Sequence, residues 1–324
     1  MLEKLVVGMG VAASLFFASC TTYRPMNVET ARPGVEFPEA VKKRYAIASF
    51  DAWKEDFVSS TRDYAEYHVK LFSNNAEVSS FQTIESRVGN NDKWIVMYPI
   101  LGGDDLELPG FIARYIFADD GISTAIVLRK EMLVTEEGPH RPLHSDDASV
   151  VDVEDYMQKS LVDTARVIKY LKASGMKDFG FMGISLGGMQ VVGTAAVFPE
   201  SKINIMLMAG GNVEDIVMNS TEKPVRVYRD YWVRELGEDK FREGLRKLRV
   251  EPLAFAKYVS TDKVRMVITT KDDAVPTKCQ FTLYDALGQP ECLLVPSNHY
   301  TLIIYLFQTA GFVTREINEA FGKE

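Results

Sequence analysis

Between residues 93 and 208 the sequence alternates short apolar runs of strand length with longer runs of helical character. The expected strands are 94–98, 123–128, 178–184 and 203–208, and the expected helices are 109–118, 153–173 and 186–198. The alternation resumes with expected strands at 264–269 and 291–295 and expected helices at 277–287 and 302–321. Strands and helices that alternate in this way form a parallel sheet covered on both faces. We therefore expect an α/β fold with a mostly parallel sheet wrapped by helices.

Two parts of the chain depart from this alternation. Residues 67–72 and 81–86 are expected to be antiparallel strands at one edge of the sheet. Residues 212–263 form a charged insertion with a helix-prone stretch at 228–249, which we interpret as a cap over the carboxyl edge of the sheet. The aromatic residues of this insertion are expected to pack the cap rather than to contact a bound molecule: Tyr228, Tyr231, Trp232 and Phe241.

A serine lies at a turn between an expected strand and an expected helix. The segment Gly183-Ile184-Ser185-Leu186-Gly187 has the pattern G-x-S-x-G. In such a turn the central residue has a strained backbone, and glycines without Cβ atoms let strand and helix approach closely enough to expose the hydroxyl. Ser185 is therefore the candidate nucleophile. The alternative is an ordinary glycine-rich turn with a solvated serine.

A serine hydroxyl becomes a useful nucleophile when a histidine, itself oriented by a carboxylate, accepts its proton. His299 follows the strand expected at 291–295, and Asp272 and Asp273 follow the strand expected at 264–269. Because the carboxyl ends of parallel strands share one edge of a sheet, these side chains are expected near Ser185. The aspartates have a second interpretation, since either can cap the helix expected at 277–287.

Three motifs in this order resemble the α/β-hydrolase family of serine esterases, lipases and dienelactone hydrolases. They are the Ser185 turn, the D-x-x-V-P loop that begins at Asp272, and Asn298-His299-Tyr300. The resemblance covers residues 66–321 and implies a Ser185-His299-Asp272 triad.

It also implies an oxyanion hole made by the backbone N–H groups of Leu186 and Leu101, although Gly102 competes with Leu101 and the family's frequent histidine is absent there. The implied reaction is hydrolysis of a small ester, thioester or amide through an acyl-enzyme. Two alternatives stay open: a non-catalytic binding or scaffold protein on the same fold, and acyl transfer to an acceptor other than water.

The first twenty residues have the character of a targeting segment. Lys4 precedes an apolar run from Leu5 to Ala18, which is too short to span a bilayer and suits a signal peptide. The residues Phe17-Ala18-Ser19-Cys20 resemble the lipobox of bacterial lipoproteins, with Phe in place of the usual Leu. The resemblance implies acylation at Cys20, export and anchoring of the chain to the membrane of the cell envelope. An uncleaved apolar anchor and an ordinary secretory signal are the alternatives.

These interpretations divide the chain into a signal peptide at 1–20, a proline-containing tether at 21–44 and a hydrolase domain at 45–324. The net charge of −8 and the lack of a long basic cluster exclude an obvious nucleic-acid partner. No metal or organic cofactor is indicated. His140 and His144 are four residues apart, but Pro139 and Pro142 break the helix that would align the two histidines as metal ligands. Cys279 and Cys292 are expected at opposite ends of a helix–strand pair and hence as buried free thiols.

Overall fold

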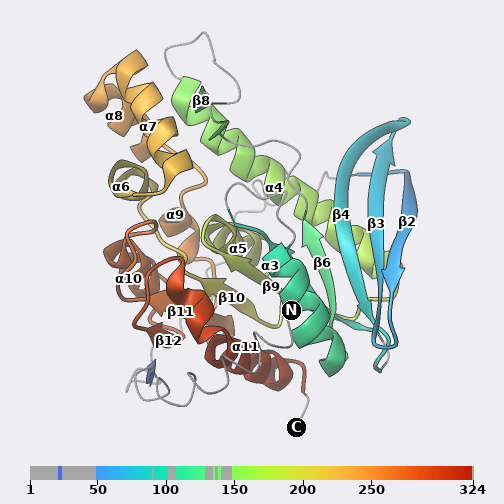
Figure 1. Cartoon of the computed structure of the whole chain (residues 1–324). Helices are drawn as coiled ribbons and strands as arrows, with labels where there is room; N and C mark the ends of the chain where they lie inside the picture. The colour runs from blue at the N-terminus through green and yellow to red at the C-terminus, as the bar shows by residue number, and fades with distance from the viewer. Residues whose placement is uncertain are drawn as a thin grey trace, which may run out of the picture.

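The computed structural model describes residues 21–23, 49–89, 91–100, 107–127, 134–135, 138–139 and 148–322. Its main sheet has six parallel strands in the order β12-β11-β10-β9-β5-β6 (Figure 1). Their bounds are β5 Lys93–Tyr98, β6 Ser123–Val127, β9 Asp178–Ile184, β10 Asn204–Leu207, β11 Val264–Thr269 and β12 Glu291–Val295. The predicted α/β class, with a mostly parallel sheet wrapped by helices, is confirmed.

Antiparallel strands extend both edges of the described sheet. Beyond β6 come β4 (Ala76–Ser86), β3 (Tyr64–Ser73) and β2 (Ala52–Ser60), and β1 (Thr21–Tyr23) pairs with β12 at the other edge. The sequence predicted two of these, β3 and β4, but not β2. Most side chains of β2 are exposed on both faces, so this strand lacks the apolar alternation by which a strand is recognised.

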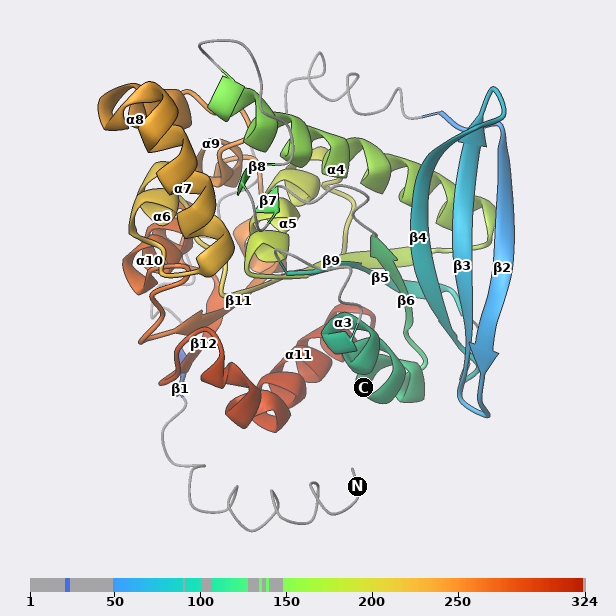
Figure 2. The same ribbon diagram turned by 45° about the horizontal axis from the view of Figure 1, so that its top comes forward.

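Helices cover both faces of the sheet (Figure 2). One face carries α4 (Ala148–Ala173), α5 (Leu186–Val197) and α10 (Thr277–Ala286). The other carries α3 (Glu107–Ile112), which continues as the π-helix η2 (Ala113–Phe117), and α11 (Leu306–Ala320). The last of these follows a 3₁₀ turn, η5 (Thr301–Tyr305), and another, η3 (Ala118–Asp120), follows η2.

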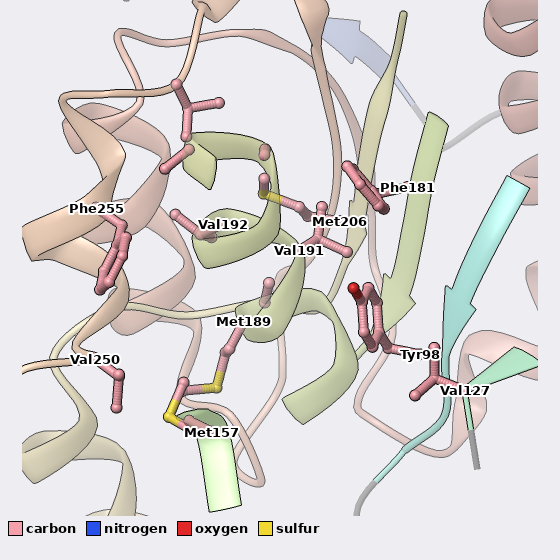
Figure 3. Packing of buried hydrophobic residues seen from close by; sticks show 14 of the residues in the cluster. Tyr98, Val127, Met157, Phe181, Met189, Val191, Val192, Met206, Val250 and Phe255 are labelled. Atoms are coloured by element: carbon pink, nitrogen blue, oxygen red, sulfur yellow. The ribbon is translucent and has the colours of Figure 1, made fainter. Parts of the chain in front are cut away.

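Strand β5 shows why the sheet is buried on both faces. Trp94, Val96 and Tyr98 belong to the apolar cluster under α4 and α5, whereas Ile95 and Met97 belong to the cluster under η2 and α11. Figure 3 shows part of the first cluster, around Val191 and Val192 of α5. Successive residues of a strand point to opposite faces, so a continuous apolar run is what a doubly covered strand requires.

The insertion at 212–263 contains four helices: α6 (Val213–Asn219), α7 (Lys223–Leu236), α8 (Glu238–Arg246) and α9 (Pro252–Ala256). The helix-prone stretch expected at 228–249 is thus divided. Gly237, with φ of +82°, separates α7 from α8 because few other residues adopt this conformation without strain. Trp232 and Phe241 are buried in the main core, in agreement with a packing role.

Several of the expected segments lie partly or wholly outside the described residues. The segment interpreted as a tether begins with β1, and a small hairpin of β7 (Val134–Thr135) and β8 (Gly138–Pro139) precedes α4. The signal peptide with Cys20, the rest of the tether, and His140 and His144 lie outside the described residues. Within the described residues, none of the helices has the length and apolarity that crossing a bilayer requires.

Cys279 and Cys292 are both buried thiols that form no disulfide with each other, as predicted. Burial, followed by the nearby charge of Asp215 and a hydrogen bond to it, raises the pKa of the Cys279 thiol to about 12. A thiol with this pKa is almost entirely protonated at neutral pH and is therefore a poor nucleophile.

The order of the strands determines where a ligand can bind. From β5 the chain passes to its neighbour β6 within the sheet. It then returns to β9, the neighbour of β5 on the other side, and continues outward through β10, β11 and β12. In open α/β sheets the crevice at such a reversal, outside the carboxyl ends of the strands, is the usual ligand site. Here the reversal lies between Tyr98 at the end of β5 and Ser185 after β9.

Candidate active site

Ser185 lies in a strained turn between β9 and α5. Its backbone has φ of +57° and ψ of −121°, a conformation that residues with a Cβ atom rarely adopt. The Ser185 N–H donates to the carbonyl oxygen of Leu207 on β10 (2.8 Å), and its own carbonyl accepts from Met189 N–H (3.1 Å). The turn is therefore held at both ends by backbone hydrogen bonds, which fixes the position of the side chain.

Two glycines make this turn possible. A Cβ atom on Gly183 would collide with the backbone of Gly187, and a Cβ atom on Gly187 would collide with the carbonyl oxygen of Tyr98. The start of α5 consequently lies against the end of β5. The N–H groups in the first turn of a helix have no partner within the helix, so the Leu186 N–H is oriented as a donor at this place.

Asp272 follows β11 and its carboxylate is fully buried. One oxygen, Oδ1, accepts from the backbone N–H groups of Ala274 (3.0 Å) and Val275 (3.1 Å). The other, Oδ2, accepts from Thr269 Oγ1 (2.7 Å) and Gln280 Nε2 (3.1 Å) and lies 2.9 Å from His299 Nδ1. These five contacts leave the carboxylate one orientation.

The surroundings of Asp272 determine its charge. Burial raises the pKa of this carboxyl, but the hydrogen bond and charge of His299, with the donors Thr269 and Val275, bring the pKa below its ordinary value of 3.8. Asp272 is therefore ionised at neutral pH and can only accept hydrogen bonds. Because the ionised carboxylate can only accept, His299 Nδ1 is the donor in the contact between the two residues.

His299 lies in the loop after β12, and its side chain is 11% exposed. Asn298 shapes this loop, because its Oδ1 accepts from Tyr300 N–H (3.1 Å), Thr301 N–H (2.9 Å) and Thr301 Oγ1 (2.9 Å). The neighbouring Tyr300 hydroxyl donates to the carboxylate of Glu222, immediately before α7. The histidine loop is thus fixed both internally and against the helical insertion.

Ser185 and His299 line one cavity of about 240 Å³. Its walls come from both parts of the chain: Leu186 and Met189 of α5, Val213 and Val217 of α6, and Val225 and Tyr228 of α7. The insertion therefore covers the site, and Tyr228 both packs the cap and borders the cavity, which the expectation of a purely packing role missed. The apolar walls and the few polar groups at one end are typical of a small-molecule site.

Ser185, Leu186 and His299 line this cavity, and Asp272 contacts His299 through Nδ1 without lining the cavity itself. Asp273 is exposed and does not share in the contacts of Asp272. Leu101, the expected second oxyanion donor, lies outside the described residues, as does Gly102.

Sequence reasoning missed the residues that hold the aspartate and the histidine, namely Thr269, Gln280 and Asn298. Gln280 is fully buried, and its Nε2 also donates to Thr269 Oγ1 (3.0 Å) and Val275 O (2.9 Å). A glutamine on an expected helix gave no signal of this role. The Asn298 side chain, one residue before a candidate histidine and three before a threonine, has the spacing of a capping contact.

No family model matches the sequence, and no curated protein is similar to it. Solved structures are similar in fold. The acetyl xylan esterase from Paenibacillus sp. R4 matches with a TM-score of 0.66 and 14% identity, over 89% of this chain and 99% of that one. Acetyl xylan esterase 1 from Thermoanaerobacterium sp. JW/SL YS485 matches with a TM-score of 0.57 and 14% identity, over 90% and 99%.

A cold-adapted esterase from an Arctic intertidal metagenomic library matches with a TM-score of 0.55 and 16% identity, over 83% of this chain and 99% of that one. Similarity at this level of identity concerns the fold, and the fold is that of the α/β hydrolases. This fold carries many different reactions, so function has to be argued from the site.

Proposed function

We propose that the protein is a serine hydrolase that cleaves a carboxylic ester of a small molecule through an acyl-enzyme. The observation that carries this proposal is the contact of 2.9 Å between His299 Nδ1 and the ionised Asp272, at a cavity that His299 shares with the strained Ser185. The three similar structures named above are esterases, and their names support an ester as the substrate.

In the proposed reaction Ser185 Oγ attacks the ester carbonyl while His299 Nε2 accepts the hydroxyl proton. The negative charge that develops on the carbonyl oxygen is stabilised by the Leu186 N–H and, as the resemblance implies, by that of Leu101. His299 then donates its proton to the departing alcohol, which leaves the acyl group on Ser185. A water molecule, deprotonated by His299, releases the acid and restores the serine.

The role of Asp272 in this scheme is electrostatic. Because its pKa is lowered, the carboxylate stays charged throughout and stabilises the imidazolium that forms when His299 takes the proton. The hydrogen bond between His299 Nδ1 and Asp272 occupies Nδ1, and the other four hydrogen bonds of Asp272 hold the carboxylate in place. The arrangement needs no metal or organic cofactor.

The test is covalent labelling of the full chain by a fluorophosphonate, with the adduct located by peptide mass spectrometry. We expect an adduct on Ser185 that disappears in Ser185→Ala and falls strongly in His299→Ala, together with turnover of p-nitrophenyl acetate. The matched control is Ser174→Ala, at the exposed end of α4, which should label normally. A folded wild-type protein that neither labels nor hydrolyses esters would reject the proposal.

We also propose that the chain is exported and attached to the cell envelope by a lipid on Cys20, which follows from the lipobox resemblance of residues 17–20 alone. Labelling with a palmitate analogue in cells should mark the wild type and not Cys20→Ala. Equal labelling of both proteins, or of neither, would reject the anchor.

A further inference from the structure

A second cavity, of about 200 Å³, lies on the opposite face of the sheet from α5. It is enclosed between Met182 and Ile184 of β9, Ile112 and Phe117 of the α3–η2 helix, and Ala310 and Val313 of α11. Figure 2 shows α11 and α3 beneath the sheet, on the side away from α4 and α5. Nothing in the reaction proposed above uses this space.

The lining of the second cavity is almost entirely apolar. Of the described residues around it, only His299, Tyr300 and Thr309 carry a side-chain nitrogen or oxygen. Thr309 is 4% exposed, and its Oγ1 has no hydrogen-bond partner among the described residues. The cavity thus suits a hydrocarbon group, for which its walls offer many dispersion contacts and few polar groups.

The second cavity adjoins the Ser185 cavity. Among the described residues, Ile100, His299 and Tyr300 line both spaces. The rim is accessible from solvent, since Tyr300 is 68% exposed and Ile303 is 59% exposed. A molecule bound at Ser185 therefore has an apolar space within reach on the far side of His299.

An empty apolar cavity of this size is unfavourable for a folded protein, because its walls lose contacts that a filled core would make. Engineered cavities of about 150 Å³ bind benzene, which has six carbons. A space of about 200 Å³ accordingly accommodates an unbranched chain of about six to eight carbons. Retention of such a space beside a reactive site is consistent with a ligand that fills it.

We propose that the second cavity binds the unbranched alkyl chain of the ester substrate, so that the protein acts on esters with a chain of medium length rather than on acetylated sugars. This inference rests on the proposed ester hydrolysis. The chain can belong to the acid or to the alcohol of the ester. His299, which protonates the alcohol, lines the second cavity, whereas Ser185, which carries the acyl group, does not, and this favours the alcohol side.

The first test measures kcat/KM for two series of esters. One series varies the acyl group of p-nitrophenyl esters from acetyl to dodecanoyl, and the other varies the alcohol of alkyl acetates over the same lengths. We expect one series to rise about fourfold for each added methylene and to level off near six to eight carbons. The series that rises identifies the side of the ester that enters the cavity. A flat or falling profile in both series overturns the inference.

The second test fills the cavity from its wall. Ala310→Leu adds three carbons inside the space without disfavouring the helix, and Ile116→Phe does so from the opposite wall. Each variant should lower the ratio of kcat/KM for long-chain esters to kcat/KM for acetyl esters at least tenfold. Ala310→Leu should also shorten the preferred chain by about three carbons. The control is Ala173→Leu, the same change at an exposed position of α4, which should leave the ratio unchanged. An unchanged ratio in both filled variants overturns the inference.

A third measurement separates the inference from the proposed function. Calorimetric titration of Ser185→Ala with 1-octanol requires no catalysis, and burial of the chain should give saturable binding with a negative heat-capacity change. Adding Ala310→Leu should weaken this binding at least tenfold, and adding Ala173→Leu should not. Octanol binding of this kind in a protein that never hydrolyses an ester would reject the proposed function and keep the site. Ester turnover with Ser185 labelled, but without octanol binding, would keep the proposed function and reject the alkyl-chain site.

Discussion

At the scale of single residues, the site depends on the different surroundings of two adjacent aspartates. Asp272 is buried and accepts five hydrogen bonds, whereas Asp273 is exposed and contributes its backbone carbonyl to Thr221 N–H (3.0 Å). Side chains of the same type, one residue apart, are thus assigned opposite roles. A comparison of the two by substitution tests the proposed orienting carboxylate directly.

We expect Asp272→Asn to lower kcat by about 10³- to 10⁴-fold, because a neutral amide neither fixes the Nδ1–H tautomer nor stabilises the imidazolium. Asp273→Asn should change kcat by no more than about twofold, as expected of an exposed position. Ester turnover and circular dichroism of both variants provide the measurement. Loss of activity in Asp273→Asn alone would show that the orienting acid has been assigned to the wrong residue.

The sequence predicted the three candidate triad positions because each follows an expected strand of a parallel sheet. It did not predict how they are held. Thr269 and Gln280 are eleven residues apart and meet at Asp272 only because α10 folds back against β11. Contacts of this kind depend on the packing of two elements, which no local pattern records.

At the scale of elements, the strongly patterned ones were predictable and the weakly patterned ones were not. Strands β9, β11 and β12 have the predicted bounds, since each consists mostly of apolar residues that are buried in the two apolar clusters. The exposed strand β2 and the division of the insertion at Gly237 were missed, because the first lacks apolar alternation and the second depends on one backbone conformation. The Ser185 turn is the best case, since its glycines are both a sequence motif and a steric requirement.

The steric requirement at this turn can be measured. Gly183→Ala places a Cβ atom against the backbone of Gly187, which cannot move without displacing α5, so we expect a loss of about 3 kcal/mol or more in the free energy of unfolding. Gly193→Ala is the matched control within α5. There the nearest atom is Leu161 Cδ2 at 3.3 Å, the end of a flexible side chain, and the better helix propensity of Ala offsets the contact.

Urea unfolding followed by circular dichroism compares the two variants. We expect Gly193→Ala to stay within about 1 kcal/mol of the wild type. Equal stability of the two variants would mean that β9 and α5 can separate at little cost, and that the close approach is not what positions Ser185.

At the scale of the whole molecule, one buried carboxylate joins the last helix to the sheet. Glu316 of α11 is fully buried and pairs with Arg265 of β11 and with Arg315, whose Nη2 lies 2.5 Å from Glu316 Oε1. Burial raises the pKa of Glu316, but the hydrogen bonds and charges of the two arginines bring it below the ordinary value of 4.5. This cluster fixes α11, and α11 forms one wall of the second cavity.

The lowered pKa gives the stability of the molecule a definite dependence on pH. A carboxyl whose pKa is lower in the folded than in the unfolded chain binds fewer protons when folded. The contribution of Glu316 to the free energy of unfolding is therefore complete above about pH 4.5. It is lost as the pH falls through the pKa of the folded state. Asp272 also has a lowered pKa, so its contribution to the free energy of unfolding is likewise lost at a pH below its ordinary pKa of 3.8. The free energy of unfolding should fall steeply between about pH 5 and about pH 3.

Glu316→Gln should be destabilised by about 3–5 kcal/mol at pH 7, because Arg265 and Arg315 lose their fully buried anionic partner and keep only the longer contacts to Glu291 and, for Arg315, to Glu319. Since glutamine does not titrate, the variant should also lose less stability than the wild type on acidification, so that the two proteins converge near pH 3. Glu319→Gln, an exposed position on the same helix, should keep the wild-type profile. Urea unfolding across this pH range measures all three proteins. A Glu316→Gln profile parallel to that of the wild type would place the acid-sensitive groups elsewhere, with Asp272 the next to substitute.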